Sequence, residues 1–378
     1  MSALPDSNKL SIRPKGGRFD ERIRSIPLLS RLVQRPELGA AAGTFLVLVF
    51  FMVTAGKSGM FGSQGILNFL EISAQLGILA VAVSILMIGG EFDLSVGSMI
   101  AFAGIVIGLS VTVFHLPLWL AILVTFAAAA AVGWLNGYLI IRTGLPSFIV
   151  TLASMYLLRG ASLVLSRSFT GRTQISNITE GAQDSFTVQL FAGRIGRDLF
   201  IWLAHNGLIE ADGNGLPMAE GIPMSFIWWL VLGSFGTWLL LRSTFGNWIF
   251  AVGGSESAAR NSGVPVNRVK IILFIISAMT ATHLATIQVL EAGSADTLRG
   301  LQKEFEAIIA SVIGGNLLTG GYGSVIGGMF GSLIFGTVST GIFYTGVDTD
   351  WFRIFLGAMI VIAVLFNDFI RRRVIRNR

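Results

Sequence analysis

Charged residues are scarce in this sequence, and their scarcity decides its class. Only 13% of its 378 residues are Asp, Glu, Lys or Arg, whereas 53% are hydrophobic. The mean hydropathy of +0.73 is too high for a soluble domain of this size. A lipid bilayer is therefore the expected solvent.

Cysteine is absent, and histidine occurs only three times. The absence of cysteine excludes disulfides, thiolate nucleophiles and cysteine metal sites, and the dispersed histidines make any other metal site unexpected. An ATP-binding loop is lacking too. Gly56-Lys57-Ser58 matches the last three residues of that motif, but the motif also needs a glycine five positions before Gly56, where the chain has Phe51. Without a nucleophile and base to place together, a membrane-embedded enzyme is the weakest hypothesis, and we expect no catalytic residue, metal or cofactor.

Long runs without charge are what the sequence contains instead. Residues 94–141 and 307–347 lack acidic and basic residues over 48 and 41 positions. Because a helix needs roughly 20 apolar residues to cross about 30 Å of hydrocarbon, each run can hold two spans and a turn. Apolar windows predict an all-α polytopic membrane protein with ten spans, at 39–56, 66–89, 97–114, 118–141, 147–165, 224–241, 271–290, 304–318, 322–343 and 351–369.

The basic residues predict which segments are cytoplasmic. Lys and Arg gather in cytoplasmic segments near span ends, and 18 of the 27 lie in segments that ten spans place inside. Residues 1–38 are expected to be a basic cytoplasmic N-terminal tail, 39–369 the transmembrane domain and 370–378 a basic cytoplasmic C-terminal tail. The expected topology of a protein embedded in membrane lipid thus explains the net charge of +6. Nucleic acid is not expected as a partner.

Residues 166–223 form the one sizeable hydrophilic stretch, which this topology places outside. Its composition allows two interpretations. It is either a linker with short interfacial helices around Phe191 and 200–203, or part of a docking surface for an external partner.

Two glycine-interrupted stretches occupy corresponding places in the chain. Ile88-Gly89-Gly90 leading to Gly97-Ser98 is echoed by Ile313-Gly314-Gly315 leading to Gly323-Ser324. Paired interrupted spans indicate a transporter pathway, although a chain with 46 glycines also produces such matches by chance.

Polar residues in the first interruption and within the spans are candidates for a solute path. Asp93 or Ser95 can cap the following helix, contact a solute, or do both. Amide and hydroxyl groups inside spans either bind a solute or join helices, and His283 in mid-span is more readily a packing residue than a proton relay. The candidate path residues are Asn68, Gln75, Asp93, Ser95, Asn136, Thr151, Ser154 and Gln288.

The segment 242–270 is more than a linker. A helix start at Ser255, with Glu256 in its first turn and Gly263 as its stop, predicts a short surface helix. In a protein without its own ATP-binding loop, this helix is a contact for a separate ATPase subunit or lies on the membrane surface.

Three segments together resemble the permease subunits of bacterial ABC importers for monosaccharides, the ribose-type family, over roughly residues 39–369. They are GGEFDLSVGS, AVGGSESAARNSGVPVNRVKI and FEAIIASVIGGNLLTGGYGSVIGGMFGSLIFG. The resemblance implies helix breaks at Gly89, Gly90, Gly97, Gly314, Gly315, Gly320, Gly321 and Gly323. It implies ATPase coupling through Gly253, Gly254, Ala258, Ala259, Gly263 and Val264, and the short helix adds Glu256 and Arg260 as coupling candidates. Asn247, where relatives often have Arg, and a long external loop depart from the family pattern.

The resemblance implies a function as well. An external sugar-binding protein would deliver a pentose or hexose to two permease copies in the bacterial inner membrane, expected as a homodimer, and separate subunits would bind ATP. The alternative is a stand-alone secondary transporter driven by an ion gradient. That alternative requires ionisable groups deep in the membrane, for which the candidates are Glu71, Arg159, His283 and Glu306.

Overall fold

The computed structural model describes residues 36–180 and 185–348, together with 350, 351, 354, 355, 357, 358 and 361. The predicted tails 1–38 and 370–378 lie almost wholly outside the described residues, as does most of the predicted span 351–369.

Within the described residues, seven helices are long and apolar enough to cross a membrane. They are α2 (Pro36–Ala55), α3 (Ser63–Ile88), α5 (Leu118–Thr143), α6 (Ser147–Thr170), α9 (Met224–Arg242), α12 (Val266–Ala292) and α14 (Val325–Tyr344). Two shorter helices, α4 (Val96–Thr112) and α13 (Lys303–Ile313), occupy two further predicted spans. The polytopic helical fold is therefore confirmed, while ten crossings remain a prediction.

Proline and glycine set several of the helix ends. Pro117, Pro146, Pro223 and Pro265 immediately precede α5, α6, α9 and α12, where a residue without a backbone N–H costs no helical hydrogen bond. Gly144 ends α5 with a φ of 68°, a left-handed conformation that glycine adopts without strain.

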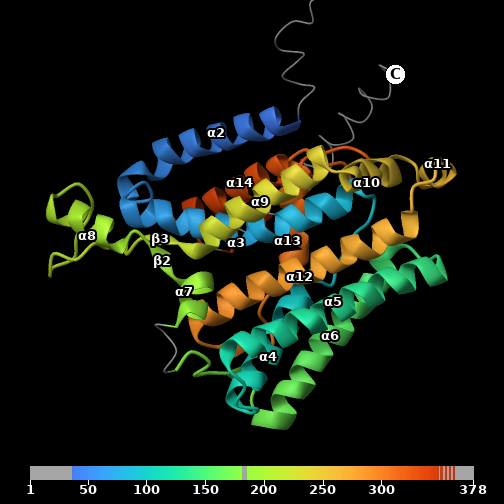
Figure 1. Ribbon diagram of the computed structural model, residues 1–378. Coiled ribbons are helices and arrows are strands. Elements are labelled where there is room, and N and C mark those ends of the chain that lie inside the picture. The colour runs from blue at the N-terminus through green and yellow to red at the C-terminus, as the bar shows by residue number, and fades with distance from the viewer. Residues whose placement is uncertain are drawn as a thin grey trace, which may run out of the picture.

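α3 is the central helix, and all of its residues from 76 to 88 are buried. It packs against α9, α12, α13 and α14, and α14 is flanked in turn by α2. On the opposite side, α12 packs against α4 and α5, and α4 packs against α6 (Figure 1). Outer helices expose large apolar side chains such as Val53 on α2 and Leu157 on α6, which suits a lipid-facing surface.

Residues 171–180 and 185–223 lie at one end of the helix bundle (Figure 1). They contain α7 (Phe186–Ala192) and α8 (Arg197–His205), so the two short helices expected around Phe191 and 200–203 are present. Two antiparallel strand pairs hold the stretch, β1 (Gln174–Ile175) with β4 (Ala295–Asp296) and β2 (Arg194–Ile195) with β3 (Ile222–Pro223). A 3₁₀ turn, η1 (Gly56–Ser58), follows α2.

The opposite end carries α10 (Thr244–Gly254) and α11 (Glu256–Asn261) (Figure 1). α11 begins as predicted, because the Ser255 side chain accepts a hydrogen bond from the N–H of Ala258. Gly263 follows it with a φ of 84°. The sequence interpretation missed α10, which Ser243 caps by accepting from the N–H of Gly246.

Candidate solute path and coupling junction

The connection between α3 and α4 is built around Asp93. One carboxyl oxygen accepts from the N–H and the hydroxyl of Ser95, and the other accepts from the Ser277 hydroxyl on α12 at 2.7 Å. The expectation that Asp93 or Ser95 caps α4 is wrong, since neither side chain accepts from a first-turn N–H of that helix. The Ser95 hydroxyl is turned to Asp93 instead.

A chain of polar side chains extends this cluster. Asn136 on α5 donates to the Ser95 hydroxyl at 3.2 Å and accepts from Ser154 on α6. Thr151 on α6 accepts from the N–H of Leu94 at 3.0 Å. Five predicted path residues thus gather in one place: Asp93, Ser95, Asn136, Thr151 and Ser154.

This gathering supports backbone rather than enclosing space for a solute. Asp93 is 3% exposed, Asn136 1% and Thr151 0%. Two hydroxyls of α6 accept hydrogen bonds from backbone N–H groups that have no partner within a helix. Ser147 accepts from the N–H of Phe92, and Thr151 accepts from that of Leu94. Buried backbone groups without partners are costly at membrane depth, so these side chains stabilise the connection.

The connection between α13 and α14 uses one amide in a comparable way. Asn316 follows Gly315, which has a φ of 90°. Its side chain accepts from the N–H of Ser324 at 2.8 Å and donates to the Ser84 hydroxyl of α3, also at 2.8 Å. Ser324 itself caps α14 by accepting from the N–H of Gly327.

The two connections meet the end of α10 through backbone alone. A Cβ added to Gly320 would lie 2.7 Å from the Cα of Gly90, and one added to Gly321 would lie 2.7 Å from the Cα of Gly254. A Cβ on Gly253 would overlap the carbonyl oxygen of Ile88. We call this contact the glycine junction; it comprises Gly90, Gly253, Gly254, Gly320 and Gly321.

The junction brings together residues that the sequence assigned to separate roles. Two were predicted coupling residues, and three were predicted helix-break residues. Glycine is required at Gly253, Gly320 and Gly321, where an added Cβ would lie within 3 Å of neighbouring backbone. Of the remaining break glycines, Gly89 and Gly314 directly follow α3 and α13, and Gly315 comes next. Gly97 instead lies near the start of α4, against Gly300 and Glu304, and Gly323 lies against the Asn316 side chain.

The other predicted coupling residues form α11 and its exit. Ala259 is buried, whereas Glu256, Ala258 and Arg260 are exposed. The N–H of Val264 donates to the carbonyl of Ala259 beyond the Gly263 turn. Arg260 pairs with Glu256 at 3.0 Å, one helical turn away. A hydrogen bond from Lys270 is the main cause that holds the pKa of Glu256 below its ordinary value.

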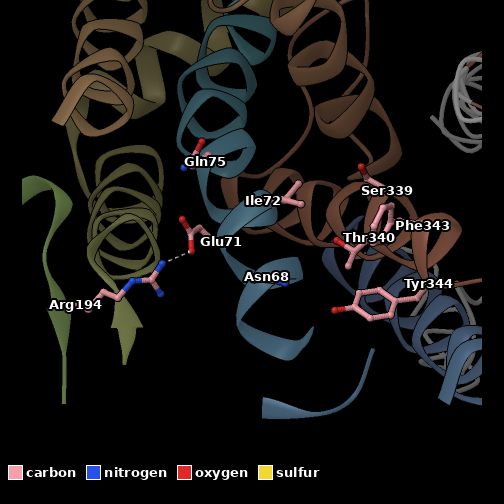
Figure 2. Close-up of a pocket in the computed structure, with 9 residues that line it drawn as sticks. All are labelled: Asn68, Glu71, Ile72, Gln75, Arg194, Ser339, Thr340, Phe343 and Tyr344. Carbon is pink, nitrogen blue, oxygen red and sulfur yellow. Dashed lines mark hydrogen bonds and ion pairs between the residues drawn. The ribbon is translucent and has the colours of Figure 1, made fainter. Parts of the chain in front are cut away.

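A cavity of about 600 Å³, lined by both polar and apolar residues, lies toward the opposite end of α3 (Figure 2). The predicted path residues Asn68 and Gln75 line it, and Gln288 donates to the Gln75 side chain at 2.9 Å. Glu71 is turned toward Arg194 of β2, 3.3 Å away (Figure 2). The full lining is Asn68, Glu71, Ile72, Gln75, Arg194, Ser339, Thr340, Phe343 and Tyr344.

The predicted path residues therefore separate into two groups. Three belong to the cavity region, and five belong to the buried cluster around Asp93. The sequence interpretation missed the α14 side of the cavity, including Phe343 and Tyr344, because two aromatic residues at the end of an apolar helix resemble an ordinary membrane-interface pair.

The ionisable candidates for an ion-driven transporter are dispersed. Glu71 pairs with Arg194, Glu306 pairs with Lys303, and Arg159 donates to the carbonyls of Thr297 and Arg299.

His283 packs edge-on against the rings of Phe191 and Trp228, with centroids 5.4 and 4.5 Å away. Its Nε2 has no hydrogen-bond partner among the described residues. Ring packing thus places His283 between α7 and α9.

Long apolar helices around a buried central helix, with glycine-rich connections meeting at one end, define a multi-pass membrane protein of the transport type. The chain belongs to the permease family whose model is described as branched-chain amino acid transport system / permease component, which matches residues 65–364.

Relatives of the chain are sugar import permeases by name. It is 30% identical to the ribose import permease protein RbsC of Escherichia coli K12 over 324 residues, covering 85% of this chain and 91% of the relative. It is 29% identical to the fructose import permease protein FruG of Bifidobacterium longum over 365 residues, covering 96% and 95%. The xylose transport system permease protein XylH of Escherichia coli K12 is 29% identical over 364 residues, covering 88% and 91%. No solved structure matches the chain.

Proposed function

We propose that this chain is the permease subunit of an ATP-driven, binding-protein-dependent importer and forms the translocation path for a monosaccharide. The glycine junction is the observation that carries this proposal. It gives the segment expected to meet an ATPase direct backbone contact with both helix connections. A force applied at the α10–α11 end therefore acts on both at once.

The chemistry of the cavity favours a sugar. Amide, carboxyl and hydroxyl groups of Asn68, Glu71, Gln75 and Thr340 can donate to or accept from sugar hydroxyls. The ring of Tyr344 offers an apolar face to the carbon skeleton. The family description names branched-chain amino acids, so an amino acid is the competing solute. The named sugars of the relatives point to a sugar instead.

The proposal includes a topology of ten spans, with both termini in the cytoplasm of a bacterial inner membrane. In this arrangement α10 and α11 face an ATPase subunit that binds ATP, and the cavity faces an external sugar-binding protein. Residues 166–223 then supply part of the docking surface for that protein. The assembly holds two permease copies as a homodimer in membrane lipid.

The test is transport by the reconstituted complex. The chain, its ATPase subunit and its binding protein are placed in proteoliposomes, and uptake of D-ribose, D-xylose, D-fructose and L-leucine is measured in turn. We expect uptake of one or more sugars that requires both ATP and the binding protein. Uptake of leucine alone would refute the sugar assignment. Sugar uptake by the chain alone, driven by a proton gradient, would refute the ATP-driven mechanism.

A further inference from the structure

Lys270 lies between two carboxylates that belong to different parts of the α10–α11 end. Its Nζ is 2.7 Å from Oε1 of Glu91 and 2.8 Å from Oε2 of Glu256. Lys270 is near the start of α12, Glu91 follows Gly90 in the α3–α4 connection, and Glu256 opens α11. One ammonium group therefore joins the predicted coupling helix, a span and a helix connection.

The two halves of this bridge differ in exposure. The side chains of Lys270 and Glu91 are 13% and 8% exposed, whereas that of Glu256 is 46% exposed. A buried ion pair resists separation, because each partner left alone is poorly hydrated. An exposed pair is worth little and exchanges partners readily. The Lys270–Glu91 half is thus the permanent one, and the Lys270–Glu256 half is exchangeable.

Glu256 has a second cation available. Arg260 lies 3.0 Å from its other carboxyl oxygen, and the same guanidinium reaches Oδ1 of Asn267 at 3.3 Å. A protein that binds the exposed face of α11 therefore meets Glu256 and Arg260 together. Rearranging the Glu256–Arg260 pair changes the strength of the Glu256–Lys270 ion pair and leaves the buried Lys270–Glu91 pair intact.

The buried half of the bridge leads into the glycine junction. The N–H of Glu91 donates to the carbonyl of Leu86 at 3.1 Å, which fixes the residue directly after Gly90. Gly90 is the member of the junction that contacts Gly253 and Gly320. The charged bridge therefore joins α11 to the α3–α4 connection, and the backbone junction joins the end of α10 to the same connection.

We propose that Lys270 is a positioning residue of the transport cycle, which carries movements of α11 through Glu256 and Glu91 to the connection between α3 and α4. The proposal rests on the proposed function, because it requires an ATPase subunit that binds at α11.

The test uses the full complex of permease, ATPase subunit and binding protein in proteoliposomes. Uptake of D-ribose, D-xylose and D-fructose is measured beside ATP hydrolysis in the same vesicles. In Lys270→Met, sugar taken up per ATP hydrolysed should fall roughly tenfold, within the range of energetic coupling between sites, while the ATPase subunit still co-purifies. Lys270→Arg should restore the ratio, because a guanidinium can reach both carboxylates. The exposed neighbour Arg268 supplies the matched control, and Arg268→Met should behave as wild type.

A second variant separates coupling from folding. Lys270→Met alone leaves Glu91 buried without its cation, whereas Glu91→Gln with Lys270→Met removes both buried charges and should fold. This double variant should be uncoupled as well. A wild-type ratio of uptake to hydrolysis in the double variant would overturn the role of Lys270 and leave the proposed function standing. A wild-type complex that takes up no sugar, or a chain that binds no ATPase subunit, would overturn the proposed function and this inference with it.

Discussion

The backbone N–H of Gly321 donates a hydrogen bond to the carbonyl oxygen of Ile88 over 2.8 Å. Ile88 is the last residue of α3, where a helix leaves carbonyl groups without partners of its own. The connection between α13 and α14 supplies the missing donor. The two glycine-rich connections are therefore bonded to each other, and moving one without the other breaks this bond.

The glycine junction predicts different responses at two adjacent glycines. In Gly253→Ala the new methyl group would overlap the Ile88 carbonyl, whereas in Gly254→Ala it would meet no atom within 4 Å. We expect Gly253→Ala to lower the free energy of unfolding by about 1–3 kcal/mol and to abolish sugar uptake. Gly254→Ala should match the wild type in thermal unfolding and uptake. Equal behaviour of the two variants would contradict the close contact at the junction.

Asp93 is expected to support both folding and transport. Asp93→Ala removes the acceptor for Ser95 and Ser277 and leaves buried hydroxyls unpaired, which should cost about 2–3 kcal/mol of unfolding free energy. Sugar uptake should stop. Ser98 is the control, because its buried hydroxyl has no partner among the described residues, so Ser98→Ala should change stability little. Thermal unfolding in detergent and uptake in vesicles measure the two effects, and normal uptake by Asp93→Ala would remove Asp93 from the mechanism.

Polar groups of the cavity should determine transport without determining the fold. Asn68→Leu removes an amide from the cavity, and we expect it to lower sugar uptake by roughly tenfold, equivalent to about 1.4 kcal/mol. The thermal unfolding midpoint should change little, because Asn68 is only partly buried. Thr54, exposed on α2 and outside the cavity lining, gives the control substitution Thr54→Leu, for which uptake should stay normal. If both variants transport equally well, the cavity is not part of the path.

His283 distinguishes the importer from an ion-driven transporter. His283→Phe keeps an aromatic ring against Phe191 and Trp228 but cannot carry a proton. We expect normal ATP-dependent uptake, with unfolding at an equal or higher temperature, because the substitution also removes a buried nitrogen without a partner. Loss of uptake in a folded His283→Phe variant would favour a proton relay instead. Measuring uptake over pH 5–8 would then show a step in the wild type alone.

Sequence reasoning succeeded where a local rule governs the structure. Lipid requires long apolar helices, so apolar runs predicted the seven long helices that the described residues contain. Ser255 and Gly263 bounded α11 because capping depends on residues only a few positions apart. The same rule applies to α10, where the Ser243 side chain accepts from the N–H of Gly246, although the sequence analysis predicts no helix there.

Partners distant along the chain could not be predicted. Ser277 reaches Asp93 across 184 positions, and Asn316 reaches Ser84 across 232. A serine or asparagine in an apolar helix carries no local signal of which residue it will meet. For the same reason, Asn136 and Gln75 looked alike in the sequence, although one lies in the buried cluster around Asp93 and the other lines the cavity.

α3 has Asn68 and Gln75 in its first half and Ile88 as its final residue. Its 26 residues form an uninterrupted rod about 39 Å long at 1.5 Å per residue. In the proposed transport cycle, a change of solute requires new side chains near one end, while the ATPase acts through the α10–α11 segment at the other. Selectivity can therefore diverge among descendants of this protein by substitutions around the cavity, with the machinery at the far end of the rod left as it is.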